Sequence, residues 1–278
     1  MPVVGQGLGG DAEGTEMLIA HVSDLHIGRD TATDRAAHLL ADSVEDSGVA
    51  MAILTGDVTH RGQREELRRF ETIFGRLLDR GRLVTVPGNH DRMGDSAGDA
   101  FMLGTRVSVS SRPGLHVVRL DSTGPHNRRL LSAHGLLTGA DLAAVDAALK
   151  AAPEDVLTVL ALHHHPLPLP TDAFPERLSN LLGWPNAAEL PLGRELVSRV
   201  LGRCDLVLHG HRHIPAELVL GEGSERPLRV LNAGATTELG RFRVLSSRGG
   251  RVGGEAWIEV EGDGSSPFAG ALVDPVAA

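Results

Sequence analysis

The chain has 278 residues, of which 41% are hydrophobic and 3% aromatic, and its 27 basic and 36 acidic side chains give a formal net charge of −9. This length can bury a large core, whereas the negative charge argues against a general electrostatic hold on nucleic acid or on an anionic membrane. The single cysteine, Cys204, excludes an internal disulfide and is expected to be a small buried residue. The cytoplasm is therefore the expected compartment.

The first 16 residues are rich in glycine and acidic side chains and lack the basic start and apolar core of an export signal. No run of about 18 apolar residues, the length of a membrane span, occurs anywhere in the chain. We expect a flexible leader over 1–16, a single domain over 17–262 and a C-terminal tail over 263–278, with no membrane partner.

From Met17 onward, short apolar runs alternate with longer segments of helical periodicity, which is the pattern of a sheet covered by helices. Strands are predicted at 17–22, 50–55, 83–86, 116–120, 156–162 and 205–208, and helices at 33–48, 64–80, 138–151 and 195–201. The proline-rich segment 166–192 predicts an ordered rim loop or cap. After Ile214 the helices stop, and runs at 217–220, 228–231, 242–245 and 256–260 predict a second, largely antiparallel sheet.

Five of the predicted strands end in polar clusters drawn from the same few residue types. The clusters hold Asp24 and His26, then Asp57, then Asn89 and His90, then the histidines 163–165, then His211 and His213. An isolated histidine is more often a surface or core residue than a ligand. A parallel sheet, however, brings the carboxyl ends of its strands together, so five clusters in series indicate one site. The segment 92–111 is glycine- and serine-rich and is expected to loop over this site.

The side chains of these clusters are carboxylates, imidazoles and one amide, with no thiolate. This mixture suits divalent ions such as Mn²⁺, Fe²⁺ or Zn²⁺. The number of ligands is too large for one ion. It fits two divalent ions that share a bridging carboxylate, an arrangement that stabilises the attacking and leaving oxygens of an in-line displacement at phosphorus.

These clusters resemble, in order, the motifs of the calcineurin-like metallophosphoesterases. The matching motifs are Asp24-x-His26, Gly56-Asp57, Gly88-Asn89-His90-Asp91, His164-x-Pro166 and Gly210-His211-x-His213. The resemblance spans about residues 17–215 and implies an α/β fold, a four-layer α/β/β/α sandwich, with a binuclear metal centre at the carboxyl ends of the strands. It implies that Asp24, His26 and His213 hold one ion, that Asn89, His164 and His211 hold the other, and that Asp57 bridges. In the family the histidine ligand precedes the proline by two residues, which selects His164 over His163 and His165.

The resemblance leaves His90 without a metal to bind and implies that it donates to the phosphoryl oxygen or the leaving group. An imidazole suits this role because its pKa lies near working pH. In the commoner family pattern an Asp three residues after the bridging Asp orients this imidazole, but this chain has His60 there. Asp91 is the nearest substitute. Whether His90 is a general acid or a neutral hydrogen-bond donor stays open.

Within the family, the stretch 162–166, the proline-rich loop after it and the Asp121-Ser122 strand end look most like the bacterial class III cyclic-nucleotide phosphodiesterases. This likeness implies a small-molecule phosphoester substrate, with a 3′,5′-cyclic nucleotide favoured. Trp184 in the rim loop is expected either to stack on a nucleobase or to plug the loop.

Other interpretations remain. Residues 21–29 also resemble the first motif of the DNA-repair nucleases of this superfamily, although the net charge of −9 counts against nucleic acid as a partner. A broad phosphomonoesterase of the same superfamily is a further possibility. A non-catalytic scaffold is expected to lose ligand histidines, and this chain keeps them all.

Overall fold

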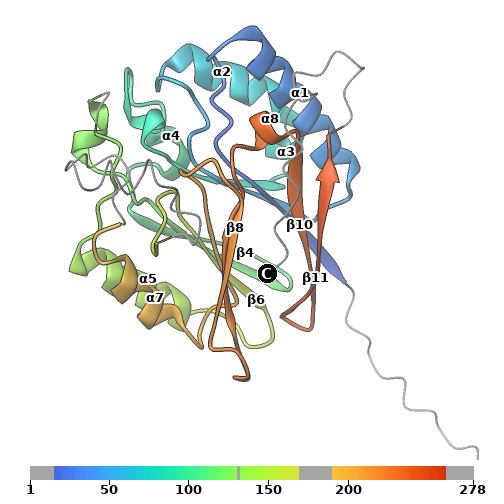
Figure 1. Ribbon diagram of the computed structural model, residues 1–278, viewed down its shortest axis with the longest axis vertical. Helices are drawn as coiled ribbons and strands as arrows, with labels where there is room; N and C mark the ends of the chain where they lie inside the picture. Colours follow the sequence, from blue (N-terminus) through green and yellow to red (C-terminus); the bar gives the residue numbers. More distant parts are fainter. Residues whose placement is uncertain (1–15, 130–131, 169–189, 261–278) are drawn as a thin grey trace, which may run out of the picture.

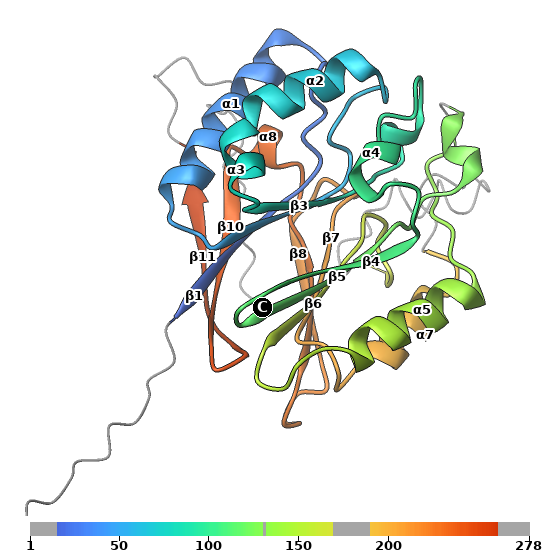
Figure 2. The ribbon, with the colours of Figure 1, turned by 180° about the vertical axis from the view of Figure 1, so that it is seen from behind.

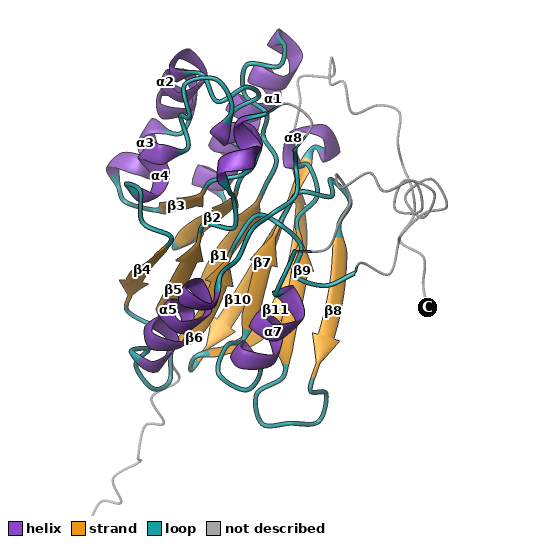
Figure 3. Cartoon of the chain, turned by 90° about the vertical axis from the view of Figure 1, so that its left-hand side faces the viewer, coloured by secondary structure: helices purple, strands orange, loops and turns teal. Residues whose placement is uncertain are grey.

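The computed structural model describes residues 16–129, 132–168 and 190–260, and within them the strands form two mixed β-sheets. The five-stranded sheet has the order β11-β10-β1-β2-β3, from β1 (Met17–Val22), β2 (Met51–Thr55), β3 (Leu83–Val86), β10 (Arg241–Arg248) and β11 (Arg251–Glu259). The six-stranded sheet has the order β4-β5-β6-β7-β9-β8, from β4 (Val107–Arg112), β5 (Leu115–Leu120), β6 (Leu157–Ala161), β7 (Leu206–His209), β8 (Ala216–Leu220) and β9 (Leu228–Asn232). Figure 3 shows β4 and β8 at the opposite edges of this second sheet.

Helices cover the outer face of each sheet (Figures 1 and 2). The five-stranded sheet carries α1 (Thr31–Asp46), α2 (Arg64–Ile73), α3 (Gly75–Asp79) and the single turn α8 (Thr236–Leu239). The six-stranded sheet carries α5 (Gly139–Lys150) and α7 (Gly193–Val200). Three short elements complete the described chain, namely α4 (Asp99–Met102) and the 3₁₀ turns η1 (His90–Arg92) and η2 (Pro125–Arg128).

Three apolar clusters fill the three interfaces between these four layers. One includes Leu40 of α1 and joins the first helices to the five-stranded sheet, and another includes Leu142 of α5 and joins α5 and α7 to the six-stranded sheet. The third lies between the sheets and contains Ile53 of β2 and Val159 of β6. The predicted four-layer α/β/β/α sandwich is therefore confirmed.

Both faces of the central strands are buried, which explains their continuous apolar runs. In β2, Ile53 belongs to the cluster between the sheets, whereas Ala52 and Leu54 belong to the cluster beneath the helices. A strand buried on both faces needs apolar side chains at every position and shows no alternation with polar ones. Cys204 is also buried, as predicted, and burial raises the pKa of its thiol to about 12.

The prediction for the last third of the chain was wrong. Its four strands do not build a sheet of their own but extend both existing sheets. β9 pairs in parallel with β7 and carries β8 antiparallel on its outer edge. β10 pairs antiparallel with β1 and carries β11. The strand pattern alone indicated the elements, but the partner of each strand depends on packing between distant segments.

Two local predictions also need correction. The predicted helix 64–80 is interrupted at Phe74, whose ψ of 11° leaves the helical region between α2 and α3. The segment 92–111 is not simply a loop, since it contains α4 and the edge strand β4. β4 alternates half-buried and exposed positions and carries several serines, so its apolar periodicity is weak.

Several predictions fall on residues that the structure does not describe. The leader, apart from Glu16, and the tail lie outside the described residues, as do 169–189 of the predicted rim loop, including Trp184. Among the helices of the described ranges, none is long and apolar enough to cross a membrane.

Candidate metal centre

The predicted ligands follow strands of both sheets. The expectation that a single parallel sheet brings them together was wrong. Asp24 and His26 follow β1, Asp57 follows β2 and Asn89 follows β3, all in the five-stranded sheet. The histidines 163–165 follow β6, and His211 and His213 follow β7, both in the six-stranded sheet. The site therefore lies where the carboxyl ends of two stacked sheets meet.

The loops that carry the predicted ligands have an unusual backbone. Five of these residues adopt left-handed φ values, namely Asp24 (54°), His26 (49°), Asp57 (49°), His211 (73°) and His213 (55°). For residues other than glycine this conformation is uncommon, costs on the order of 1 kcal/mol each, and concentrates at functional sites. Backbone hydrogen bonds hold the first two loops together, from Asp24 N to Gly56 O and from His26 N to Asp57 O, each 3.0 Å long.

One group of side chains, the outer cluster, consists of Asp24, His26, Asp57 and His213. The Nε2 atoms of His26 and His213 lie 3.1 Å apart. His213 Nε2 is 3.5 Å from Asp24 Oδ1, and His26 Nε2 is 4.0 Å from Asp57 Oδ2. The ring nitrogens and carboxylate oxygens thus converge on one small volume. The side chain of His213 is 38% exposed, so this cluster opens toward solvent.

A second group, the inner cluster, consists of Asp57, Asn89, His163 and His211. His163 Nε2 lies 3.1 Å from Asn89 Oδ1, 3.3 Å from His211 Nδ1 and 3.5 Å from Asp57 Oδ2. His163 Nδ1 donates to the Thr55 carbonyl over 2.8 Å, so Nε2 of the neutral ring presents a lone pair to the cluster. The same oxygen, Asp57 Oδ2, therefore faces both clusters.

The hydrogen bonds separate His163 from His164. Distance alone groups both with His211 as possible metal ligands. Yet His164 Nε2 donates to the Ala133 carbonyl over 2.9 Å, and His164 Nδ1 lies 2.8 Å from the Ser122 hydroxyl, so both ring nitrogens have protein partners. These hydrogen bonds favour His163 over the expected His164 as a metal ligand, and the assignment stays a proposal. His165 stacks on the His211 ring at 5.8 Å.

Strand parity explains why His163 and not its neighbour faces Asp57. Ala161 belongs to the cluster between the sheets, and Leu162 to the cluster on the helix side. Continued alternation sends His163 toward the first sheet and His164 toward the helices. The spacing to Pro166 does not indicate which face of β6 meets the other ligands, because only the packing of the two sheets defines that face.

The electrostatics of the clusters fit a divalent cation. Burial lowers the pKa of His26 to about 3 and holds that of His211 well below its usual value, so both rings are neutral. Burial also raises the pKa of Asp24. At Asp57 the effect of burial is outweighed by the neighbouring histidines, His163 above all, which hold its pKa well below the usual value. In turn Asp57 outweighs burial at His163 and raises the pKa of that ring to about 9. Buried carboxylates beside neutral imidazole lone pairs form a donor set for Mn²⁺, Fe²⁺ or Zn²⁺.

His90 is held against this centre by two contacts. Its backbone N–H donates to Asp57 Oδ1 over 2.8 Å, and its Nδ1 donates to the main-chain carbonyl of His60 over 2.7 Å. The imidazole of His60 lies beside that of His90 with ring centroids 5.7 Å apart, and both rings lie near His26. A carbonyl group of the chain, and not a carboxylate, therefore orients His90.

Asp91 does not take over the orienting role that the sequence suggested. Its Oδ1 accepts from the N–H and the hydroxyl of Thr59, and its Oδ2 accepts from the N–H groups of Gly88 and Val58. The carboxylate is fully buried, and burial together with the charge of Asp57 raises its pKa to about 6. Asp91 thus ties the loop after β2 to the loop after β3.

Two groups that orient the ligands of the inner cluster have no separate signal in the sequence. The Thr55 carbonyl fixes the proton of His163, and the Ser122 hydroxyl accepts from the N–H of His164 over 3.1 Å. A main-chain carbonyl leaves no mark in a sequence. Ser122 was visible only as part of a strand end.

A family model described as calcineurin-like phosphoesterase matches residues 17–215. The chain belongs to this family. With its two clusters of His and Asp side chains, this calcineurin-like protein is a metal-dependent phosphoesterase.

Two solved structures share the fold of this phosphoesterase at low sequence identity, and a third is less similar. A dimetal phosphatase from Danio rerio is 12% identical with a TM-score of 0.58, over 88% of this chain and 99% of that chain. The purple acid phosphatase PPD1 from yellow lupin is 11% identical with a TM-score of 0.60, over 89% of this chain and 54% of that chain. The phosphopantetheinyl hydrolase of Mycobacterium tuberculosis is 18% identical with a TM-score of 0.48, over 81% and 92% of the two chains. No curated protein sequence matches the chain.

Proposed function

We propose that the protein is a phosphodiesterase that uses two divalent ions to hydrolyse a small phosphoester. The position of Asp57 carries this proposal. Its Oδ2 lies 4.0 Å from a ring nitrogen of the outer cluster and 3.5 Å from one of the inner cluster. A single carboxylate oxygen between two sets of lone pairs is the arrangement that a bridged pair of ions requires.

In this proposal each cluster holds one ion. Asp24, His26 and His213 ligate the outer ion, and Asn89, His163 and His211 ligate the inner ion, with Asp57 shared. Two bound divalent ions would neutralise the phosphoryl oxygens and lower the pKa of water at the site. The left-handed backbone of the ligand loops and the carbonyl behind His163 hold the side chains ready for this task.

His90 supplies the proton for the leaving group. Because its Nδ1 already donates to a carbonyl, its Nε2 carries a proton only when the ring is charged. A neutral His90 would present a lone pair to the substrate. His90 therefore acts as a general acid in its imidazolium form. A neutral ring with its proton on Nε2 would place the lone pair of Nδ1 against the carbonyl oxygen of His60.

A 3′,5′-cyclic nucleotide is the favoured substrate. Support comes from the sequence likeness around residues 162–166 to the class III cyclic-nucleotide phosphodiesterases. The net charge of −9 further disfavours a long polyanion such as DNA. Because the ribose 3′ oxygen is a poor leaving group, such a substrate also needs the proton that His90 donates.

A substrate panel tests this function. Protein loaded with Mn²⁺ is assayed with p-nitrophenyl phosphate, bis(p-nitrophenyl) phosphate, 3′,5′-cyclic AMP and single-stranded DNA, with Asp57→Ala protein as the background control. We expect the highest kcat/KM on cyclic AMP. A highest value on the monoester or on DNA would replace the proposal with a phosphomonoesterase or a nuclease. No turnover by protein that holds two ions would indicate a scaffold.

A further inference from the structure

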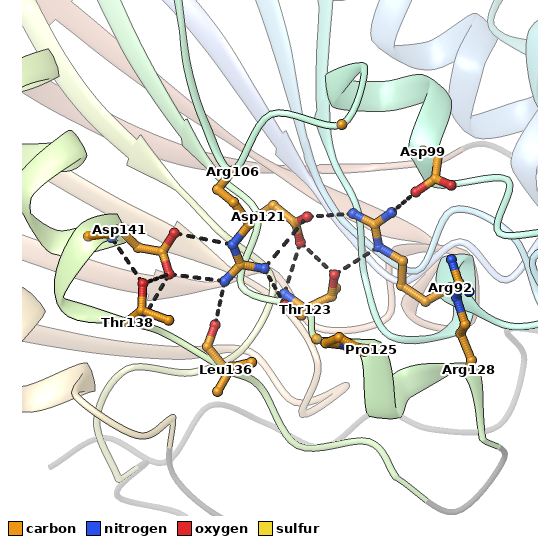
Figure 4. Close-up of a pocket in the computed structure, with 13 residues that line it drawn as sticks. Arg92, Asp99, Arg106, Asp121, Thr123, Pro125, Arg128, Leu136, Thr138 and Asp141 are labelled. Carbon is orange, nitrogen blue, oxygen red and sulfur yellow. Dashed lines mark hydrogen bonds and ion pairs between the residues drawn. The ribbon is translucent and has the colours of Figure 1, made fainter.

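A pocket of about 730 Å³ is lined in part by Arg92, the last residue of η1 (Figure 4). Three arginines and three aspartates line it, namely Arg92, Arg106, Arg128, Asp99, Asp121 and Asp141. Figure 4 shows the carboxylate of Asp121 between the guanidinium groups of Arg92 and Arg106. None of the residues of the two metal clusters lines this pocket, so the network needs an explanation of its own.

Arg92 is the centre of this network and the last residue of η1, the turn that begins at His90. Its Nε donates to the Thr123 hydroxyl over 2.8 Å, and its two terminal nitrogens form ion pairs with Asp99 and Asp121. The side chain is only 13% exposed. All three guanidinium nitrogens are thus engaged, which holds the guanidinium in one orientation.

The partner loop leads from this network to the inner cluster. Asp121 accepts from the N–H of Thr123 over 2.9 Å, which closes a tight turn around Ser122. The Ser122 hydroxyl in turn accepts from the backbone N–H groups of His163, over 3.3 Å, and His164, over 3.1 Å. The loop 121–123, which Arg92 contacts, therefore positions the backbone of His163 and His164.

Polar contacts link the two sheets at their carboxyl ends, where His90 follows β3 of the five-stranded sheet and His163 follows β6 of the six-stranded sheet. The hydrogen bond from His163 Nδ1 to the Thr55 carbonyl of β2 is one such contact. The cluster between the sheets is apolar, and apolar burial is non-directional, so it does not by itself hold two loops in a fixed register. Charge-assisted hydrogen bonds are directional, and those of Arg92 join the His90 turn to the loop that holds His163.

We propose that Arg92 is a positioning residue that, through Asp121 and Thr123, holds His90 in register with the inner metal cluster. This inference rests on the proposed phosphodiesterase function. It assigns no substrate contact to Arg92. A misplacement of His90 by about 1 Å is enough to lower the rate about 100-fold, which sets the size of the effect to look for.

The test compares Arg92→Met and Arg92→Lys with Arg226→Met. Arg226 is a matched control because its guanidinium pairs with the buried Asp205 over 2.6 Å and 2.9 Å, but at the amino end of β7. We expect Arg92→Met to lower kcat on the best substrate of the panel about 10- to 100-fold. KM should change less than about threefold, and two ions should remain bound. Arg92→Lys should recover part of the rate, and Arg226→Met should lower thermal stability without lowering kcat.

A double-mutant cycle with His90→Ala separates positioning from general stabilisation. If Arg92 acts through His90, Arg92→Met should reduce the residual rate of His90→Ala by less than about twofold. An equal loss in both backgrounds would overturn the inference, as would full activity of Arg92→Met.

A readout without turnover keeps this inference distinct from the proposed function. In Zn²⁺-loaded protein labelled with ¹⁵N-histidine, the ring resonances of His90 should shift in Arg92→Met and stay in place in Arg226→Met. Unshifted resonances in Arg92→Met would overturn the positioning role. Wild-type protein that turns over no phosphoester would overturn the proposed function instead, while these spectra would still decide whether Arg92 positions His90.

Discussion

The inner and outer clusters use similar side chains but are built differently. His163 is buried, and the Thr55 carbonyl fixes its proton, so the inner cluster presents its lone pair in one orientation. His213 of the outer cluster is 38% exposed, and its Nδ1 lies 3.7 Å from a carboxylate oxygen of Glu238, too far for a hydrogen bond. A ligand that is oriented from behind binds its metal more tightly than one that is not. The inner ion is therefore expected to stay bound when the outer ion exchanges.

Asp57 is the one residue that both clusters share, so its removal should have the largest effect. Asp57→Ala is expected to lower kcat by about 10⁴-fold or more and to reduce the metal bound at both clusters. Asp57→Asn, which keeps the volume and one oxygen donor, serves as the control and should retain part of the metal. Metal analysis of the purified variants measures the number of ions that each retains. Wild-type metal content in Asp57→Ala would refute the bridging assignment.

His90 lies outside both ligand sets, and its removal should separate rate from metal binding. His90→Ala should lower kcat about 10²- to 10⁴-fold with little change in KM, because the proton is needed only as the leaving group departs. Two ions should remain bound. The loss should be much larger for a ribose leaving group than for p-nitrophenolate, which departs without a proton. Loss of one ion would place His90 in the ligand shell.

The adjacent histidines 163 and 164 offer a matched pair that tests the inner cluster. His163→Ala should lower the affinity for the inner ion more than about 100-fold. This loss exceeds the 10- to 100-fold loss expected when a group that orients a ligand is removed. His164→Ala should lower the affinity no more than about tenfold, because both nitrogens of His164 are engaged with Ala133 and Ser122. Competition with a chromophoric chelator measures both values. The reverse order would restore His164 as the ligand.

The pH dependence of metal affinity should differ between the clusters. His163, with a pKa of about 9 in the metal-free protein, must release a proton before Nε2 binds an ion. The affinity of the inner cluster should therefore rise about tenfold per pH unit from pH 7 to pH 9 and level off above. His26, with a pKa of about 3, is already neutral throughout this range and adds no such slope to the outer cluster. Chelator titrations at pH 7, 8 and 9 measure both slopes, and a flat inner slope would contradict this account.

The sequence predicted the place and composition of the site better than its internal contacts. Apolar strands that end in Asp, Asn and His clusters are a local pattern, and the resemblance of these clusters to the metallophosphoesterase motifs implied the four-layer sandwich. The split of the site between two sheets was missed, because β1, β2 and β3 lie in one sheet and β6 and β7 in the other, and no local pattern marks the change of sheet. The choice of His163 over His164 depends on the same fact, since only the packing of the sheets defines which face of β6 meets Asp57.

The surroundings of His90 show a second limit of sequence reasoning. The sequence offered two side chains, His60 and Asp91, as partners for this imidazole. In the structure, the His60 carbonyl accepts from His90 instead. The Asp91 carboxylate accepts from the backbone N–H groups of Thr59 and Gly88. Main-chain acceptors are present at every residue, so no residue type marks the one that a catalytic histidine uses.

The central claim is that two ions share Asp57 between the inner and outer clusters. Anomalous diffraction at the zinc absorption edge from crystals of Zn²⁺-loaded protein tests it most directly. We predict two peaks about 3.5–4 Å apart on either side of Asp57 Oδ2, one bonded by His26 and His213 and the other by His163 and His211. A single peak, or an inner peak bonded by His164 with His163 out of reach, would contradict the account.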